Sequence, residues 1–351
     1  MSKIELIIHA GAGKTGSTAI QQALGRNQGR LEKQGACYCG LVFDRVGAPR
    51  KPGVPISEEF DGKLRLGPEA FGDYLRSQLA GVQDYCKQHE LQRAIWSNEA
   101  IFSQVETVGP ALRRLSDDFN LRFVAFVRRQ DYWFLSAYKQ WGIRHKNYSG
   151  VVQDFETWYQ RFKPNGDFSK TLAQWESYVG IDRMDIRVYD KTDDVLSDFL
   201  SLIGIDGSGF TLANDRGYQS PPPSVLALYK IFNSQFEDSV HPEALSRALE
   251  RTKLLGFPTK AIQPDLGLPN RTRLEAILTE FADSNRSLER YSKREYSVAF
   301  PSDSMRRDPS EDIVDSDQLV ASLLLMLVEQ DKRLQRCEAR LRKLEDAQST
   351  P

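Results

Sequence analysis

The chain opens with a short apolar run that leads directly into a glycine-rich turn and then into a helical pattern. Residues 4–10 read Ile-Glu-Leu-Ile-Ile-His-Ala, which is typical of a strand buried in a parallel sheet. Residues 11–16 are rich in glycine, and Ile20 and Leu24 then follow at helical spacing. A strand, a glycine turn and a helix in this order predict the start of an α/β fold.

Apolar runs and amphipathic stretches continue to alternate as far as residue 202. Further strands are predicted over residues 92–97, 121–127 and 184–189, and helices over 70–87, 132–141 and 195–202. Residues 45–68 contain four prolines and several glycines, which predicts a long surface loop. Beyond residue 215 the pattern is helical, over 224–232, 242–254 and 274–285.

Three segments follow from this pattern. Residues 1–302 are expected to form one α/β domain, with a central parallel sheet flanked by helices. Residues 303–318 are polar and predict a linker, and residues 319–346 predict one long helix.

Apolar residues recur along that last helix at heptad spacing. Val320, Leu327, Leu334 and Leu341 occupy one heptad position; Leu323, Cys337 and Leu344 occupy the other, with Gln330 as the polar exception. The spacing predicts either a short coiled coil that joins copies of the chain or a helix that docks on its own domain.

Charge and cysteine content narrow the class of protein. The 47 basic residues balance 48 acidic ones, so no overall field attracts nucleic acid or an anionic membrane, and an anionic ligand needs a local site. The four scattered cysteines predict free thiols in a reducing compartment. The first residues lack a signal-peptide pattern, and no apolar run reaches membrane-spanning length, so a cytoplasmic location is expected.

The turn Gly11-Ala12-Gly13-Lys14-Thr15-Gly16-Ser17-Thr18 carries the strongest chemical signal. Glycines let backbone N–H groups turn toward an anion, and the start of the following helix adds partial positive charge. Lys14 adds a full positive charge, and the hydroxyls of Thr15, Ser17 and Thr18 add further donors. This combination predicts a phosphate-binding loop.

The loop departs from the Walker A pattern of kinases and NTPases. That pattern requires a glycine where this chain has Ile8, and a Walker A protein also needs a strand that ends in aspartate to hold Mg²⁺. The apolar strand 121–127 ends instead in Arg128-Arg129. These departures favour a site without metal, in which fixed cations meet a polyanion.

Lys14-Thr15-Gly16-Ser17-Thr18 resembles the 5′-phosphosulfate loop of sulfotransferases, with Gly13 where that family usually has proline. The family's second motif is a strand that ends in arginine, followed eight residues later by a helical serine. Arg128 and Ser136 have this spacing. Arginine at a strand end presents a planar fork to a phosphate, which gives the pairing a physical reason.

The resemblance implies a P-loop-like sulfotransferase fold and transfer of a sulfuryl group from 3′-phosphoadenosine 5′-phosphosulfate (PAPS), without metal, to a hydroxyl or amine. It implies that residues 13–18 hold the 5′ end of the donor, that Arg128 and Ser136 hold the 3′-phosphate, and that Tyr189 lies near the adenine. The downstream segments are similar to bacterial carbohydrate-type sulfotransferases, so the acceptor is expected to be a carbohydrate or a small metabolite. The C-terminal Arg-Lys-Gly-x-x-Gly motif of the eukaryotic cytosolic enzymes has no match.

Lys14 is expected to stabilise charge on the leaving oxygens, and Glu99, just past a strand end, is the candidate base for the acceptor proton. Glu99 could instead cap a short helix, and His9 is the rival base. Aromatic and basic residues after Arg128 suit either an acceptor site or an aromatic core with a basic tip: Tyr132, Trp133, Trp141, Arg144, His145 and Lys146.

Two other functions remain open at this stage. Gly13-Lys14-Thr15 is compatible with a nucleotide-dependent kinase or NTPase, which would bind ATP with Mg²⁺. The second alternative is a sulfotransferase-like domain without activity, which displays the helix 319–346 to a partner.

Overall fold

The computed structural model describes residues 3–46, 56–192, 194–211, 221–240, 245–247, 249, 266–293, 296–302, 308–311 and 316–348. The chain divides into two compact units. The first comprises Met1–Trp133, Lys163–Asp215 and Ala276–Asp303, and the second Phe134–Phe162, Arg216–Glu275 and Ser304–Pro351.

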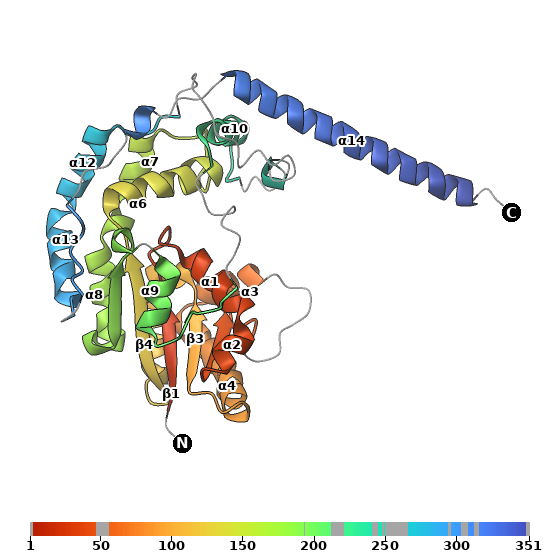
Figure 1. Cartoon of the computed structure of the whole chain (residues 1–351). Coiled ribbons are helices and arrows are strands. Elements are labelled where there is room, and N and C mark those ends of the chain that lie inside the picture. The colour runs from red at the N-terminus through yellow and green to blue at the C-terminus, as the bar shows by residue number, and fades with distance from the viewer. Residues whose placement is uncertain are drawn as a thin grey trace. The chain divides into compact units, whose positions relative to one another are not determined.

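The first unit is built on a five-stranded parallel sheet of order β2-β3-β1-β4-β5, shown in Figure 1. Its strands are β1 Ile4–His9, β2 Ala36–Gly40, β3 Arg93–Ser97, β4 Phe119–Val127 and β5 Met184–Val188. β1 lies in the middle, paired with β3 on one side and β4 on the other, which explains why Leu6, Ile7 and Ile8 are completely buried. The predicted α/β fold with a central parallel sheet is confirmed.

Helices cover both faces of this sheet. On one face, α1 (Ser17–Arg26), α2 (Gln28–Glu32) and α9 (Val195–Leu202) bury an apolar cluster against β1, β3 and β4. On the other face, α8 (Phe168–Val179) packs its Trp175 ring 4.8 Å from the ring of Phe123 in β4. Other described helices of this unit include α3 Ile56–Arg65, α4 Pro68–Gln88, the 3₁₀ helix Glu99–Ser103, α5 Val105–Leu115 and α13 Ala282–Leu288.

Several predicted boundaries are wrong. The prolines of 45–68 do not keep the whole segment in a loop, because α3 forms over Ile56–Arg65; residues 47–55 lie outside the described part. The predicted helix 274–285 is two helices, α12 (Arg271–Glu280) and α13, which break at Phe281, where φ is −101°.

One predicted strand is shorter than expected, and several elements were not predicted. β5 ends at Val188, and Tyr189 begins a 3₁₀ turn instead of closing the strand. β2, α5, α7 and α8 had no predicted counterpart, and residues 242–254 fall largely outside the described residues.

The described part of the second unit is mainly helical. Its elements include the π-helix Tyr138–Arg144, α7 Phe155–Phe162, α10 Pro223–Asn233 and α14 Ser316–Gln348; α6 (Gln130–Ala137) and α12 pass from one unit to the other along the chain. Its core is aromatic, with the Trp158 ring 5.4 Å from that of Tyr138 and stacked 4.4 Å from that of Phe162. Lys146 is 1 % exposed, and its amine donates to the carbonyls of Gly150 and Phe236.

Lys146 therefore anchors the unit instead of forming a basic tip for an acceptor. Arg144 also turns inward, with its guanidinium 5.6 Å from the centre of the Tyr229 ring. These two basic residues therefore pack with the aromatic core, and the solvated basic tip expected with that core is wrong for them. Among the described residues, no helix is long and apolar enough to cross a membrane.

Candidate functional site

The predicted functional residues of the first unit follow three neighbouring strand ends. The glycine loop follows β1, Asn98 and Glu99 follow β3, and Arg128 follows β4. Because β1 is paired in parallel with both β3 and β4, these segments emerge at the same edge of the sheet. The carboxyl edge, where connections diverge from a central strand, is where α/β proteins bind ligands.

The loop between β1 and α1 adopts an unusual backbone conformation. Gly13, Lys14 and Gly16 all have positive φ angles, of 65°, 55° and 80°. Glycine adopts this conformation readily, whereas a lysine there carries a steric cost of about 1–2 kcal/mol. Strain of this kind at a non-glycine residue is typical of functional loops, and here it falls on the predicted catalytic lysine.

Backbone donors collect at the start of α1. Of the residues that the structure describes, none accepts a hydrogen bond from the backbone N–H groups of Thr15, Gly16, Ser17 or Thr18. Gly16 caps the helix without a side-chain hydrogen bond, so the first-turn donors remain oriented outward from the helix end. Successive N–H groups in such a turn form a concave site for an anion.

Two loop hydroxyls lie beneath the backbone. The Oγ1 of Thr15 and the Oγ of Ser17 are buried, and within the described residues neither has a hydrogen-bond partner. A Cβ atom placed on Gly11 would lie 2.7 Å from each of them, so the missing side chain of Gly11 makes room for both. Whether these two hydroxyls bind the ligand stays a prediction; of the three hydroxyl residues, Thr18 is the exposed one.

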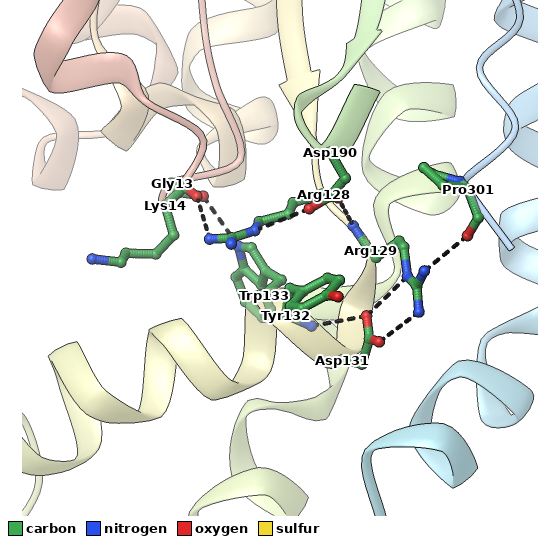
Figure 2. A network of polar contacts seen from close by, with 9 residues as sticks. All are labelled: Gly13, Lys14, Arg128, Arg129, Asp131, Tyr132, Trp133, Asp190 and Pro301. Carbon is green, nitrogen blue, oxygen red and sulfur yellow. Dashed lines mark hydrogen bonds and ion pairs between the residues drawn. The ribbon is translucent and has the colours of Figure 1, made fainter. Parts of the chain in front are cut away.

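Arg128 reaches from the end of β4 to the loop, as Figure 2 shows. Its Nη1 donates to the carbonyl oxygen of Lys14 at 3.2 Å, and its Nε donates to Asp190 at 3.4 Å. In the same view the Lys14 side chain points away from the Arg128 guanidinium. The Arg128 guanidinium thus contacts the Lys14 backbone while the Lys14 side chain points elsewhere. In this arrangement the two cations can bind two different anionic groups.

Asp190 fixes the position of this arginine. Besides the contact with Arg128, its Oδ2 accepts a 2.7 Å hydrogen bond from the backbone N–H of Arg129. Burial raises the pKa of the Asp190 carboxyl above its usual value, and the neighbouring N–H and guanidinium offset part of that effect. Asp190 was not identified from the sequence, and its position two residues after the end of β5 was the available signal.

Arg129 serves a different purpose from its neighbour. It is 4 % exposed, forms a two-point ion pair with Asp131 at 3.2 and 2.7 Å, and donates to the carbonyl of Pro301. A buried arginine with these partners holds the start of α6 to the segment around Pro301. Of the two adjacent arginines, Arg128 therefore contacts the loop and Arg129 stabilises the unit.

Trp133 also supports the loop. Its indole Nε1 donates to the carbonyl oxygens of Ala12 at 3.0 Å and Gly13 at 3.2 Å, and the side chain is 3 % exposed. A buried indole bound to the loop backbone does not face an acceptor. Trp133 is therefore not an acceptor candidate; its role is to hold the backbone of the loop.

The two remaining predicted donor-binding residues lie in different units. Tyr189 is partly buried in the first unit, with its ring 5.0 Å from the Arg128 guanidinium. Ser136 lies in α6 and belongs to the second unit. Its role at a 3′-phosphate stays a prediction.

Glu99 is partly buried at the first position of the 3₁₀ helix after β3, where the Nε2 of Gln21 in α1 donates to its Oε2 at 2.6 Å. Gln21 was not identified from the sequence. The capping alternative for Glu99 is wrong, because the side chain of Asn98 caps this helix by accepting from the N–H of Ala100 at 2.9 Å.

His9 is completely buried and shares a 2.7 Å hydrogen bond between its Nδ1 and the Oγ of Ser97. Burial lowers the pKa of His9 to about 3. An imidazole that is completely buried and so weakly basic is a poor general base for an incoming acceptor. Its interior position favours Glu99 over His9.

The low pKa of His9 gives an expected pH dependence of stability. The unfolded chain binds a proton near pH 6.5, whereas the folded chain does so only near pH 3, so this stability is present above pH 6.5 and is lost as the pH falls. The free energy of unfolding should drop by about 2 kcal/mol between roughly pH 6.5 and 4.5 from this group alone. Urea titrations should show a shallower acid dependence for His9→Gln; identical slopes for the variant and the parent chain would contradict it.

Gly16→Ala is expected to destabilise the first unit by about 2 kcal/mol or more, because alanine is strained at positive φ and overpacks its neighbours. The new Cβ would lie 2.7 Å from Cγ1 of Val195 and 3.1 Å from the Tyr189 ring. Gly29→Ala is the matched control, since nothing lies within 4 Å of a Cβ there. Urea unfolding should show the loss in the first variant only.

Comparisons with known proteins give a faint likeness to sulfotransferases. No family model matches the sequence, and no curated protein does. Two similar solved structures are a sulfotransferase from Alicyclobacillus acidocaldarius (TM-score 0.31, 12% identity, 66% of this chain and 93% of that one) and the sulfotransferase domain of the Synechococcus PCC 7002 olefin synthase (TM-score 0.29, 14% identity, 80% of this chain and 94% of that one). At these scores the likeness carries no functional conclusion, and the chemistry is inferred from the site itself.

Proposed function

We propose that this protein transfers a sulfuryl group from 3′-phosphoadenosine 5′-phosphosulfate to a hydroxyl or amine of an acceptor. The observation that carries this proposal is the contact between Arg128 and the carbonyl of Lys14, which brings two cations to one loop at the carboxyl edge of the sheet. A donor with phosphates at both the 3′ and 5′ positions of its ribose needs two such points of positive charge.

The residues present fit such a donor. The outward N–H groups of residues 15–18 and the amine of Lys14 would hold the 5′-phosphosulfate end, at the positive end of α1. Arg128, held by Asp190, would hold the 3′-phosphate. A role for Ser136 there rests on the resemblance of the motif alone. Tyr189, beside the Arg128 guanidinium, offers an aromatic ring for the adenine.

The chemistry needs one cation and one base. In the transfer, the bond between sulfur and the bridging oxygen of the 5′-phosphate breaks, and a new bond forms between sulfur and the acceptor oxygen or nitrogen. Lys14 stabilises the negative charge that gathers on the leaving phosphate oxygen. Glu99 takes the acceptor proton, and Gln21 holds its carboxylate in place beside α1.

The acceptor class rests on the sequence resemblance, which favours a carbohydrate or a small metabolite. The structure reduces the number of residues available to it, because Trp133 and Lys146 are committed to backbone carbonyls. Screening of sugars and small alcohols with labelled donor would identify the acceptor.

Glu99→Gln is expected to lower kcat by about 100-fold or more, because the amide cannot take the proton of the acceptor. The amide oxygen can still accept from Gln21, so donor affinity should stay within a few-fold of the parent value. Glu106→Gln, at an exposed position of α5, controls for the loss of one carboxylate. Equal turnover in Glu99→Gln and the parent chain would remove Glu99 from the role of base.

A thermal-shift comparison of ligands tests the proposed donor against the nucleotide-kinase alternative. The product nucleotide 3′-phosphoadenosine 5′-phosphate, without metal, should raise the melting temperature more than ATP with Mg²⁺ at equal concentration. A ligand at 100 times its Kd stabilises a protein by about 2.7 kcal/mol, which such a scan detects. A larger shift with ATP and Mg²⁺ would favour a kinase or NTPase, and no shift with either would favour a domain without activity.

A further inference from the structure

The C-terminal helix α14 exposes a row of large apolar side chains. Val320, Leu323, Leu327, Leu334 and Leu341 are 53%, 44%, 65%, 62% and 58% exposed. They fall on the two positions of the heptad repeat that form the contact seam of a coiled coil. An apolar row of this length on one helix marks a surface for association.

The helix's own unit leaves this row uncovered. α14 contacts α10 within the second unit, and Met326 is partly buried. Val320, Leu323 and Leu327 stay exposed along the same part of the helix. The contact with α10 therefore leaves these seam residues exposed and available to a partner.

The charges beside the seam indicate which partner fits. Arg333 precedes Leu334 and Glu338 follows Cys337, so the two exposed residues flank the seam on opposite sides with opposite charge. In a parallel pair of identical helices, Arg333 of one helix faces Glu338 of the other. An antiparallel pair would place arginine beside arginine, which is unfavourable. On the outer side of the helix, Arg336 pairs with Glu329 of its own chain at 2.9 Å, so these charges are satisfied without a partner.

We propose that α14 forms a parallel, in-register, two-stranded coiled coil with a second copy of this chain. In this arrangement Leu334 packs against the Leu334 of the second copy. Gln330, the polar residue of the seam, likewise hydrogen-bonds to the Gln330 of the second copy. A polar seam residue fixes the register of a coiled coil, because any shift would place it against an apolar side chain. This inference is independent of the catalytic function, since it uses no residue of the loop.

The first test measures the mass of the full chain in solution by sedimentation. The parent chain should be a dimer at micromolar concentration, and Leu334→Glu should weaken the dimer by about 100-fold or more, because two leucines leave the seam. Ala339→Glu, an exposed position on the opposite side of the helix, adds the same charge and should leave the dimer intact. A monomeric parent chain, or equal weakening by both variants, would overturn the proposal.

The second test fixes the direction of the two helices. Cys337 lies at a seam position and is exposed, whereas Cys37, Cys39 and Cys86 are buried. In the parallel register two copies of Cys337 face each other, so copper phenanthroline with oxygen should remove two electrons and two protons and join them by one disulfide. Cys337→Ser should remain uncrosslinked while still sedimenting as a dimer. A parent dimer that fails to crosslink would refute the parallel register.

Discussion

Lys14→Ala is expected to lower kcat/KM for the sulfate donor by about 10³-fold, because the variant loses the cation that meets the charge developing in the transition state. The backbone strain at residue 14 should persist in this variant, since alanine at a φ of 55° is strained like lysine. Unfolding in urea should therefore be nearly unchanged, so the loss of activity cannot be attributed to a damaged fold.

Lys14→Gly provides the matched control for this reading. Glycine relieves the positive φ, so this variant should be more stable than the alanine variant by about 1 kcal/mol while remaining equally inactive. Steady-state kinetics and urea unfolding of the two variants together separate the strain from the charge. Retention of full activity by either variant would contradict a catalytic role for Lys14.

Arg128→Ala is expected to lower the affinity for 3′-phosphoadenosine 5′-phosphate by about 100-fold, because a charge-assisted contact to phosphate is lost. The affinity for adenosine 5′-phosphate, which has no 3′-phosphate, should change by only a few-fold. Asp190 keeps its hydrogen bond from the N–H of Arg129, so the site around it should remain ordered. Calorimetric titration with both nucleotides measures this selectivity.

Arg129, the neighbouring arginine, provides the control for Arg128→Ala. Arg129→Ala removes one member of a buried ion pair and should cost about 3 kcal/mol or more of unfolding free energy. At a temperature where it stays folded, it should still discriminate between the two nucleotides. If Arg128→Ala lost both nucleotides equally, or if Arg129→Ala alone lost the discrimination, the assignment of Arg128 to the 3′-phosphate would be wrong.

The parts of the site that depend on short, local sequence patterns were predicted. The buried strand, the glycines and the helix after them identified the loop, and the apolar strand that ends in arginine identified Arg128. The parallel pairing of β1 with β3 and β4 then explains why residues far apart in sequence share one edge of the sheet.

The contacts that arrange the site could not be predicted in the same way. Asp190 orients Arg128 from 62 residues away, and no local pattern links an aspartate after one strand to an arginine after another. From its position after Arg128, Trp133 suited either an acceptor site or an aromatic core, and neither alternative foresaw that its indole binds the loop backbone. The sequence also gave no sign that the hydroxyls of Thr15 and Ser17 lie beside Gly11, where a larger residue would have no room.

Elements with weak local patterns were missed for related reasons. β2 is only five residues long and contains two cysteines and a glycine, so its apolar pattern is short. α3 follows a proline-rich stretch, and the prolines outweighed its amphipathic pattern. Tertiary packing, as between Phe60 of α3 and Phe71 of α4, decides such segments.

Calorimetry on the parent protein tests most directly whether Lys14 and Arg128 together bind a nucleotide with phosphates at the 3′ and 5′ positions of its ribose. Without metal, 3′-phosphoadenosine 5′-phosphate should bind at least about 100-fold more tightly than adenosine 5′-phosphate, because only the former engages Arg128 as well as the loop. Equal dissociation constants for the two nucleotides would mean that the second phosphate finds no partner, and would contradict the proposed sulfotransferase function.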